Sequence, residues 1–348
     1  MPEQPSAQRG WGAIGSPRIW MLADDRPGNV NQALGLAEAL GEPFQVKSLD
    51  YGPMARLPNW LWPANLSGIT SASRDALTPP WPDLVIGAGR RTAPIGRWLK
   101  EQNPDLRLVQ LMWPGSADDF DLIAVPEHDR VPDHPQIMRT FGPPHRITPT
   151  LLREASAALA PRVADLPKPY IGCLVGGTSK HVAFTPDDAV SLIKGASALA
   201  SKRGGSLFVT TSRRTGQLCA EAIAGALDGP HLFHRWQPGS DNPYLGILGY
   251  ADAIVVSADS ASMCTEACAI GKPVFLHSPT AGIPEKFELL HRRFAEHGCL
   301  KPLGSPWFEV DAPPENPANA VAASIKQLFM RPDGALSLGP VVSEAIAP

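Results

Sequence analysis

Three polar stretches in the second half of the sequence combine the residue types that hold a pyrophosphate. They run over Gly176–Lys180, Thr210–Thr215 and Ser257–Glu266, and each directly follows an apolar run. Glycines allow close backbone approach to a ligand, a helix N-terminus offers free N–H groups, and an arginine offers a two-pronged donor. The pattern favours a nucleotide phosphate site made by Gly176, Gly177, Thr178, Ser179, Thr211, Ser212, Arg213, Arg214, Asp259, Ser260 and Ser262.

The third stretch holds more polar side chains than the start of a helix needs. Asp259, Ser260 or Ser262 can each cap the helix expected over residues 261–270, and one helix needs only one cap. Glu266 stands one turn beyond Ser262 on the same face, where its carboxylate can accept both hydroxyls of a ribose. The alternative for Glu266 is an ordinary exposed helix residue.

Each of these stretches also has a plainer interpretation. Gly176-Gly177 matches neither GxxxxGK[ST] nor GxGxxG, so it can simply be a tight turn. Arg213-Arg214 can be a solvated surface, and Met263 lies on an adjoining apolar face that is expected to pack in the core. Three polar turns in one sheet are stronger evidence than any one of them.

A further polar cluster follows the first apolar run of the chain. Asp24, Asp25, Arg26, Asn29 and Gln32 lie at the start of an expected helix. An N-cap with solvated charges explains part of this cluster, but two adjacent acids followed by an arginine exceed what a cap requires. We therefore interpret these five residues as candidate contacts for a substrate.

Two more turns of the first half add candidates. Arg90 and Arg91, in a Gly-rich turn after the apolar run at 83–86, can meet an anionic group. His128 lies beside two carboxylates and is a candidate general base, with Asp25 as the other candidate. The plainer alternative for His128 is a surface histidine.

Strand and helix patterns alternate along the whole chain, which predicts parallel sheets covered by helices. The fold class expected is α/β, with two Rossmann-like domains facing across a cleft. The strands are expected at 18–23, 44–49, 83–86, 106–112, 122–125, 137–141, 170–175, 206–210, 231–235, 253–256 and 274–276. The divisions expected are a disordered leader (1–16), a first domain (17–150), a second domain (167–312) beyond a proline-rich boundary, a helix (313–332) that can pack back on the first domain, and a tail (333–348).

Composition excludes several classes of protein. The 348 residues carry a net charge of −3, which gives no reason to expect nucleic-acid binding. No apolar run is long enough to cross a bilayer, and the five cysteines do not suggest a disulfide framework. Cys264 and Cys268 lack further ligands at zinc spacing, so neither a metal nor a cofactor is expected. The expected location is the cytoplasm.

An aromatic segment, Trp60-Leu61-Trp62, lies in a proline-rich stretch of the first half. Packed loop aromatics are the simpler explanation, and a lipid-facing patch is the alternative. The second explanation would place the protein at the periphery of the inner membrane.

Five motifs together resemble the bacterial relatives of the plant elongated-mitochondria fission proteins. They are DDRPGNVNQALGLAEAL, GAGRRTAPIGRWLK, TTSRRTG, NPYLGILGYAD and ADSASMCTEACAIGKPV, and the resemblance runs from about Ile19 to Leu300. The plant members are implicated in recruiting a dynamin-like protein to mitochondria, and bacterial copies are sometimes labelled sugar-nucleotide epimerases.

More remotely, the second half is similar to the donor half of GT-B glycosyltransferases. In the lipid-linked N-acetylglucosaminyltransferases of that type, a small-residue turn, a Glu-Ala pair and a Gly-x-Pro bind the ribose and phosphates. The residues that match are Ser260, Ser262, Met263, Glu266, Ala267, Gly271 and Pro273, whereas the usual Gly-Gly-x-Gly turn is not evident.

The leading hypothesis is a metal-independent, glycosyltransferase-like protein. It would bind a nucleotide-sugar in the second domain and transfer the sugar to an unknown acceptor, lipid-linked or of the cell envelope, held by the first. The alternatives are a non-catalytic adaptor that recruits a partner at a membrane, and a sugar-nucleotide 2-epimerase.

Overall fold

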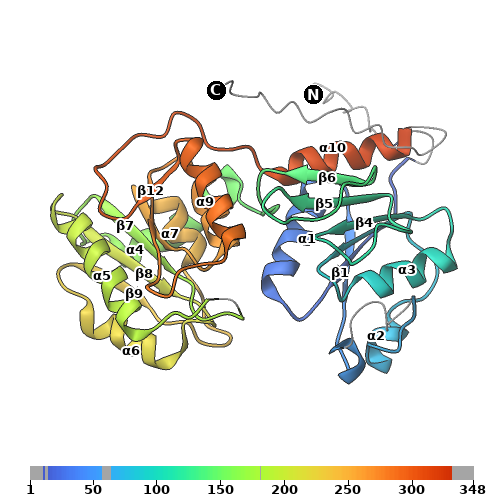
Figure 1. Ribbon diagram of the computed structural model, residues 1–348, viewed down its shortest axis with the longest axis horizontal. Helices are drawn as coiled ribbons and strands as arrows, with labels where there is room; N and C mark the ends of the chain where they lie inside the picture. The colour runs from blue at the N-terminus through green and yellow to red at the C-terminus, as the bar shows by residue number, and fades with distance from the viewer. Residues whose placement is uncertain (1–10, 12–14, 57–63, 181, 331–348) are drawn as a thin grey trace, which may run out of the picture. The chain divides into compact units, whose positions relative to one another are not determined.

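The computed structural model of the chain describes residues 11, 15–56, 64–180 and 182–330 (Figure 1). Its contacts divide the chain into two compact units. The first unit comprises Met1–Arg146 with Asn316–Pro348, and the second comprises Ile147–Glu315. The aromatic segment at 60–62 and the tail at 333–348 lie outside the described residues.

The first unit is built on a parallel sheet whose strands follow the order β2-β1-β3-β4-β5-β6. The strands are β1 (Ile19–Ala23), β2 (Phe44–Ser48), β3 (Leu84–Ala88), β4 (Arg107–Leu111), β5 (Leu122–Pro126) and β6 (Ile137–Thr140). The helices are α1 (Pro27–Ala39), α2 (Ser71–Asp75), α3 (Ala93–Gln102) and α10 (Pro317–Met330), with a 3₁₀ turn at Pro53–Arg56. The chain passes from one side of β1 to the other between β2 and β3, so β1 and β3 flank the point where the strand order reverses.

Both faces of this sheet are buried, as the near-continuous apolar strands require. One core contains side chains of α1 and α10, and the other contains side chains of α3. Helix α10 packs on α1, although some 280 residues separate them in the chain. Asn316, at the start of this return, accepts a hydrogen bond from the His145 N–H at 3.4 Å and donates one to the His145 carbonyl at 2.7 Å.

The second unit contains another parallel sheet, in the order β12-β11-β10-β7-β8-β9. The strands are β7 (Tyr170–Val175), β8 (Ser206–Thr211), β9 (His231–His234), β10 (Ala253–Ser257), β11 (Val274–His277) and β12 (Leu300–Pro302). The helices are α4 (Pro149–Val163), α5 (Pro186–Ser201), α6 (Gly216–Ala226), α7 (Tyr244–Tyr250), α8 (Ala261–Cys268) and α9 (Glu285–Glu296). When the strands of this unit are numbered 1 to 6 from β7 to β12, their order in the sheet from β9 to β12 is 3-2-1-4-5-6. This is the Rossmann order, and β7 and β10 flank its switch point.

These two sheets confirm the predicted fold class of two Rossmann-like α/β domains. The strands were predicted within one or two residues, except that β12 was missed because three residues give too short a pattern. The arrangement of the two domains across a cleft stays a prediction.

Two details of the predicted organisation differ from the structure. The helix expected between Ile147 and the proline-rich boundary is α4, but it runs through Pro161 to Val163 and packs on α7, so it belongs to the second unit. Pro161 has no N–H to donate to the Ala157 carbonyl, so one helical hydrogen bond is missing in the last turns of α4. In the leader, Trp11 is 1% exposed and lies edge-on to Phe329 at 5.1 Å, so the expectation of disorder is wrong at that residue.

None of the helices that the structure describes is both long and apolar enough to span a bilayer.

Helix α5 begins with a capping box, which gives a test of local stability. The Asp188 N–H donates to Thr185 Oγ1 at 3.2 Å, and the Thr185 N–H donates to Asp188 Oδ2 at 2.9 Å. Thr185→Ala removes one of these acceptors and is expected to lower the free energy of unfolding by about 1 kcal/mol. Urea unfolding would measure it, with Thr185→Ser, which keeps the hydroxyl, as the control. A loss equal to that of Thr185→Ala in the serine variant would contradict the capping role.

Candidate functional site

The polar stretches predicted to hold ligands lie at or beside the switch points of the two sheets, where the strands end. In the second sheet, the turns after β7 and β10 are adjacent because these strands pair directly, with Val256 opposite Leu174. The turn after β8 joins them from the other side of β7. A switch point leaves a crevice outside the carboxyl ends of the strands, and this is where open α/β sheets bind ligands.

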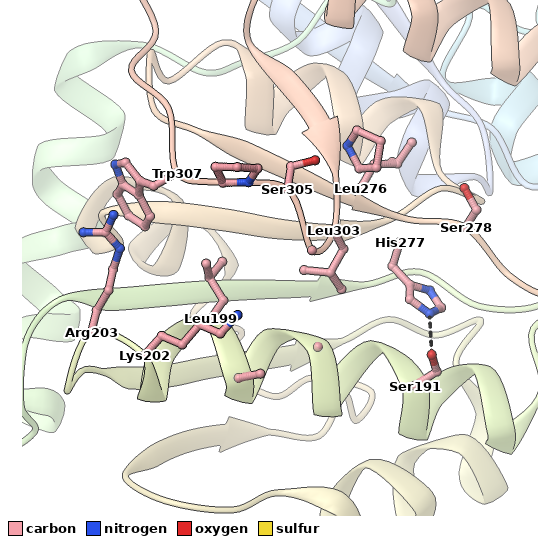
Figure 2. Close-up of a pocket in the computed structure, with 15 residues that line it drawn as sticks. Ser191, Leu199, Lys202, Arg203, Leu276, His277, Ser278, Leu303, Ser305 and Trp307 are labelled. Carbon is pink, nitrogen blue, oxygen red and sulfur yellow. Dashed lines mark hydrogen bonds between the residues drawn. The ribbon is translucent and has the colours of Figure 1, made fainter.

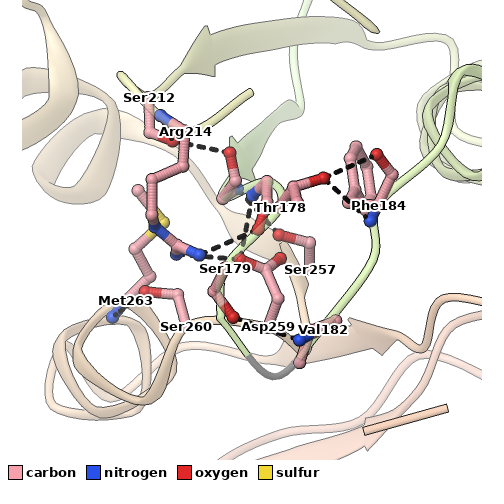
Figure 3. A network of polar contacts seen from close by, with 12 residues as sticks. Thr178, Ser179, Val182, Phe184, Ser212, Arg214, Ser257, Asp259, Ser260 and Met263 are labelled. Carbon is pink, nitrogen blue, oxygen red and sulfur yellow. Dashed lines mark hydrogen bonds and ion pairs between the residues drawn. The ribbon is translucent and has the colours of Figure 1, made fainter. Parts of the chain in front are cut away.

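The Gly176-Gly177 turn is fixed by side chains from the turn after β10. The Gly176 N–H donates to Ser257 Oγ and the Gly177 N–H donates to Asp259 Oδ2, both at 2.8 Å (Figure 3). A side chain at Gly176 would collide with the Asp259 carboxylate, and Gly177 has a φ of +143°, which strongly favours glycine. Both glycines are therefore required by this turn.

Arg214 closes the same network from the turn after β8. Its guanidinium forms an ion pair with Asp259 Oδ2 at 2.8 Å and donates to the Gly177 carbonyl at 2.8 Å. Asp259 is fully buried, and its Oδ1 atom has no partner among the described residues. The three turns therefore meet, and part of the positive charge predicted for a phosphate is already neutralised by Asp259.

Two hydroxyls in this network were not predicted as site residues. Ser257 holds the Gly176 N–H, and Thr215 Oγ1 donates to the Gly176 carbonyl at 2.6 Å. Ser212 Oγ donates to the same carbonyl at 2.5 Å. Thr215 ends the second polar stretch and Ser257 begins the third, so their position in these motifs was the signal that could have identified them.

Helix α8 begins two residues after Asp259, so its N-terminus directly follows this network in the chain. Ser260 is the N-cap, and its hydroxyl accepts from the Met263 N–H at 3.5 Å. The first turn contains no acidic residue, and the nearest carboxylate is Asp259, which directly precedes the N-cap and is paired with Arg214. Met263 and Ser262 are both partly exposed, whereas Ala267 is buried as expected for the core-facing side.

Glu266 is not an exposed helix residue, and its carboxylate already has a hydrogen-bond partner. Its carboxylate accepts a hydrogen bond from the Tyr244 hydroxyl, which comes from α7. Burial raises the Glu266 pKa from 4.5 to about 7, although the bond from Tyr244 acts in the opposite direction. Sequence patterns could not reveal Tyr244, because it reaches Glu266 across 22 residues.

Other predicted residues of the second unit have structural roles or lie at the surface. The Thr178 hydroxyl bonds both backbone groups of Phe184, and Thr211 Oγ1 accepts from the Trp236 N–H at 2.8 Å. The Ser179 hydroxyl accepts from the Val182 N–H at 3.2 Å. Arg213 is exposed beside this network.

The switch point of the first sheet brings together another set of predicted residues. Asp24 Oδ2 accepts from Asn29 Nδ2 at 2.7 Å, and the Arg26 N–H donates to Asp24 Oδ1 at 3.0 Å. Arg91, from the turn after β3, donates to both carboxylate oxygens of Asp25 at 2.7 and 2.8 Å. Burial, the largest effect, raises the Asp24 pKa.

Three further candidates of the first unit are distributed around this cluster. Gln32 is buried, and its Oε1 atom has no partner in the described part of the chain. Arg90 donates to the Ala55 carbonyl at 3.3 Å, and burial lowers its pKa. The interpretation of His128 as a surface histidine is wrong, since it is 4% exposed. It follows β5, which is three strand spacings or ~14 Å from β1, so Asp25 and His128 do not act as a pair.

The family described as mitochondrial fission ELM1 matches residues 27–329, most of the chain and both switch points. The chain belongs to the mitochondrial fission ELM1 family. Two relatives show how the family extends. An uncharacterised protein of Rickettsia prowazekii, RP120, is 29% identical over 80% of this chain and 87% of its own length. The mitochondrial fission protein ELM1 of Arabidopsis thaliana is 29% identical over 61% of this chain and 55% of its own length, so the match spans about half of the plant protein.

Solved structures show the fold that this ELM1-family chain shares. The UDP-GlcNAc 2-epimerase of Methanocaldococcus jannaschii aligns with a TM-score of 0.50 at 12% identity, covering 89% of this chain and 99% of the epimerase. A putative UDP-N-acetylglucosamine 2-epimerase of Listeria monocytogenes aligns with a TM-score of 0.51 at 11% identity, covering 90% of each chain. These similarities agree with the GT-B-like fold of two Rossmann-like units, and at this identity they show the fold alone.

Within the described ranges of this ELM1-family chain, no group of three or more His, Cys, Asp or Glu side chains is placed to hold a metal ion. All five cysteines are buried free thiols. Cys264 contacts His291 at 3.4 Å, and burial raises the pKa of the Cys264 thiol far above its usual range. Cys264 and Cys268 lie on the buried side of α8, where their sulfur atoms serve as small apolar groups.

Proposed function

We propose that the second unit binds a nucleotide-sugar at the switch point between β7 and β10. The observation that carries the proposal is the meeting of three polar turns with the N-terminus of α8 outside the carboxyl ends of these strands. Free N–H groups at the start of α8, whose first turn contains no acidic residue, favour the phosphates of such a ligand. The M. jannaschii epimerase, which shares the fold, is named for UDP-GlcNAc, so uridine nucleotides are the first probes.

The remaining groups of the site define the parts of the ligand they would contact. Ser260, Ser262 and the first turn of α8 would hold the phosphates, together with Arg213. Arg214 would contribute if the phosphate shares its guanidinium with Asp259. Glu266 would accept the ribose hydroxyls beside Tyr244.

The first unit would supply the acceptor in this proposal. Asp25 lies at the switch point of its sheet, so it is the better placed of the two candidate bases. It would take the proton of an acceptor hydroxyl as that oxygen attacks the anomeric carbon and the nucleoside diphosphate leaves. The Arg91 side chain, bonded to both Asp25 oxygens, would orient the carboxylate.

Calorimetry of the full chain with UDP, UDP-GlcNAc and UDP-glucose tests the proposal directly. We expect at least one of them to bind with one ligand per chain, because one switch point of this kind exists in the second sheet. The proposal is overturned if none of these ligands binds, and if ADP, GDP and their nucleotide-sugars do not bind either. If UDP-GlcNAc changes into its 2-epimer without an acceptor, the protein is an epimerase and the transfer reaction is excluded.

A second candidate is a non-catalytic adaptor, and one observation favours it. Asp259 already neutralises the Arg214 guanidinium through an ion pair. This is the arrangement expected of a site that no longer binds phosphate. The plant relative is named for mitochondrial fission and not for an activity on nucleotide-sugars.

Asp259→Asn distinguishes the two candidates. Asparagine can still accept from the Gly177 N–H, but it no longer neutralises Arg214. If the site binds nucleotides, the freed charge is expected to tighten the binding of UDP, measured by calorimetry. An adaptor is expected to bind no nucleotide with either residue at this position.

A further inference from the structure

A groove of about 950 Å³ runs along α5 on the other side of the second sheet from α8 (Figure 2). The crossovers place these helices on opposite faces, since β7 leads through α5 in one direction and β10 leads through α8 in the other. One wall of the groove is α5, and the other is formed by the end of β11 and the segment at 302–307. The groove lies on the α5 face of the sheet, and its His277 end adjoins the switch-point site, because His277 of β11 pairs with Ser257 of β10.

One end of the groove carries two cations that none of the described acidic residues neutralises. The Arg203 guanidinium stacks on the Trp307 ring at 3.9 Å, and Lys202 lies beside it at the end of α5. In the part of the chain that the structure describes, neither side chain forms an ion pair or a side-chain hydrogen bond. Stacking fixes the plane of the guanidinium and leaves its edge free, which suits a phosphate. The helix C-terminus accounts for a cation here, but not for the fixed orientation of Arg203.

The opposite end of the groove presents hydroxyl and imidazole groups. His277 is 9% exposed, and its Nε2 atom lies 3.3 Å from Ser191 Oγ. Its Nδ1 atom is buried with no partner among the described residues, and burial lowers the pKa of the ring, which keeps it neutral. Ser278 lies beside it (Figure 2). Neutral imidazole and hydroxyls both donate and accept, which matches the hydroxyls of a polyol.

The distance between the two ends indicates an elongated ligand. Ser191 and Arg203 are separated by twelve residues along α5, or ~18 Å at 1.5 Å per residue. Between them the walls alternate leucines with Ser305, Gly195 and Gly304. An acyl chain offers no partner to the Ser278 hydroxyl and none to Ser191 beyond its contact with His277, whereas a saccharide pairs with both hydroxyls and still packs against the leucines.

We propose that this groove binds a saccharide that carries a terminal phosphate. The phosphate lies at Lys202 and Arg203, and the sugar hydroxyls exchange hydrogen bonds with Ser191, which His277 positions, and with Ser278. The proposal concerns a second site and does not depend on the switch-point site.

Calorimetry of the full chain with trehalose 6-phosphate tests this assignment, with trehalose and inorganic phosphate as partial ligands. We expect trehalose 6-phosphate to bind more tightly than either part. Lys202→Gln combined with Arg203→Gln is expected to weaken it about tenfold to a hundredfold, since hydrogen bonds to charged groups are lost. Lys194→Gln is the matched control, because Lys194 is exposed on the same helix but does not line the groove.

The hydroxyl end has its own variant. Ser191→Ala with His277→Phe is expected to weaken trehalose 6-phosphate and leave inorganic phosphate unchanged. UDP binding, where present, is expected to be the same in all these variants, which separates this proposal from the switch-point site. The proposal is overturned if trehalose 6-phosphate does not bind, if Lys194→Gln weakens it as much as the double variant, or if decyl phosphate binds more tightly.

Discussion

Replacing Asp259 with alanine is expected to lower the free energy of unfolding of the second unit by about 3 kcal/mol. The substitution removes the partner of the Arg214 guanidinium and of the Gly177 N–H in one step. Breaking a buried ion pair leaves its remaining charge without compensation, and such losses reach about 3 to 5 kcal/mol. The lower end applies here because the Arg214 side chain keeps 29% exposure to water.

Hydrogen exchange at increasing urea concentration measures this loss unit by unit. Peptides from residues 170–260 report on the second unit, and peptides from residues 84–126 report on the first. Asp25→Ala is the matched control: it removes the other switch-point ion pair, but Asp25 is 57% exposed, so the expected cost is within about 1 kcal/mol. Equal losses from the two substitutions would contradict the role assigned to burial of Asp259.

Glu266→Ala is the second large effect, and it concerns binding. If the carboxylate accepts the ribose hydroxyls, its removal is expected to weaken UDP about tenfold to a hundredfold. Because the pKa of Glu266 is raised to about 7, the carboxylate forms only as the pH rises through that value. UDP affinity in the wild-type protein is therefore expected to increase between pH 6 and pH 8, and Glu266→Gln is expected to remove this dependence.

The stability of the unliganded protein changes in the opposite direction. A folded pKa of about 7 against an ordinary 4.5 means that the folded state favours the protonated acid. This contribution is fully present below pH 4.5 and is lost as the pH rises to about 7. Tyr244→Phe is the control, because it removes the hydrogen bond that lowers the Glu266 pKa and so shifts both profiles to higher pH. Unchanged profiles in this variant would show that another group titrates.

The sequence predicted the two sheets because parallel strands are buried on both faces and read as short apolar runs. Val255 and Ile171 are examples of residues whose burial follows from such runs. The turns at the switch points were also predictable, since glycine and small polar residues collect where strands end. Strand β12 was missed because its three residues give no pattern of their own.

Side-chain partners that join distant parts of the chain were not predictable. Asp259 appeared to be a ligand contact or a cap, and the structure shows that it is committed to Arg214 and Gly177. Tyr244 reaches Glu266 from a helix whose pattern indicates only apolar packing. Pairings of this kind depend on how two elements meet in space, which local propensity does not encode.

The return of α10 to the first unit has a consequence for synthesis of the chain. Val321, Ile325 and Leu328 belong to the same core as Leu36 of α1, yet the ribosome makes them after the whole second unit. All residues of the second unit have been synthesised once Glu315 has left the ribosome. The first unit still lacks α10 at that point, so the side of α1 that packs on α10 is uncovered until synthesis of α10. Translation therefore finishes the two units in the reverse of the order in which it starts them.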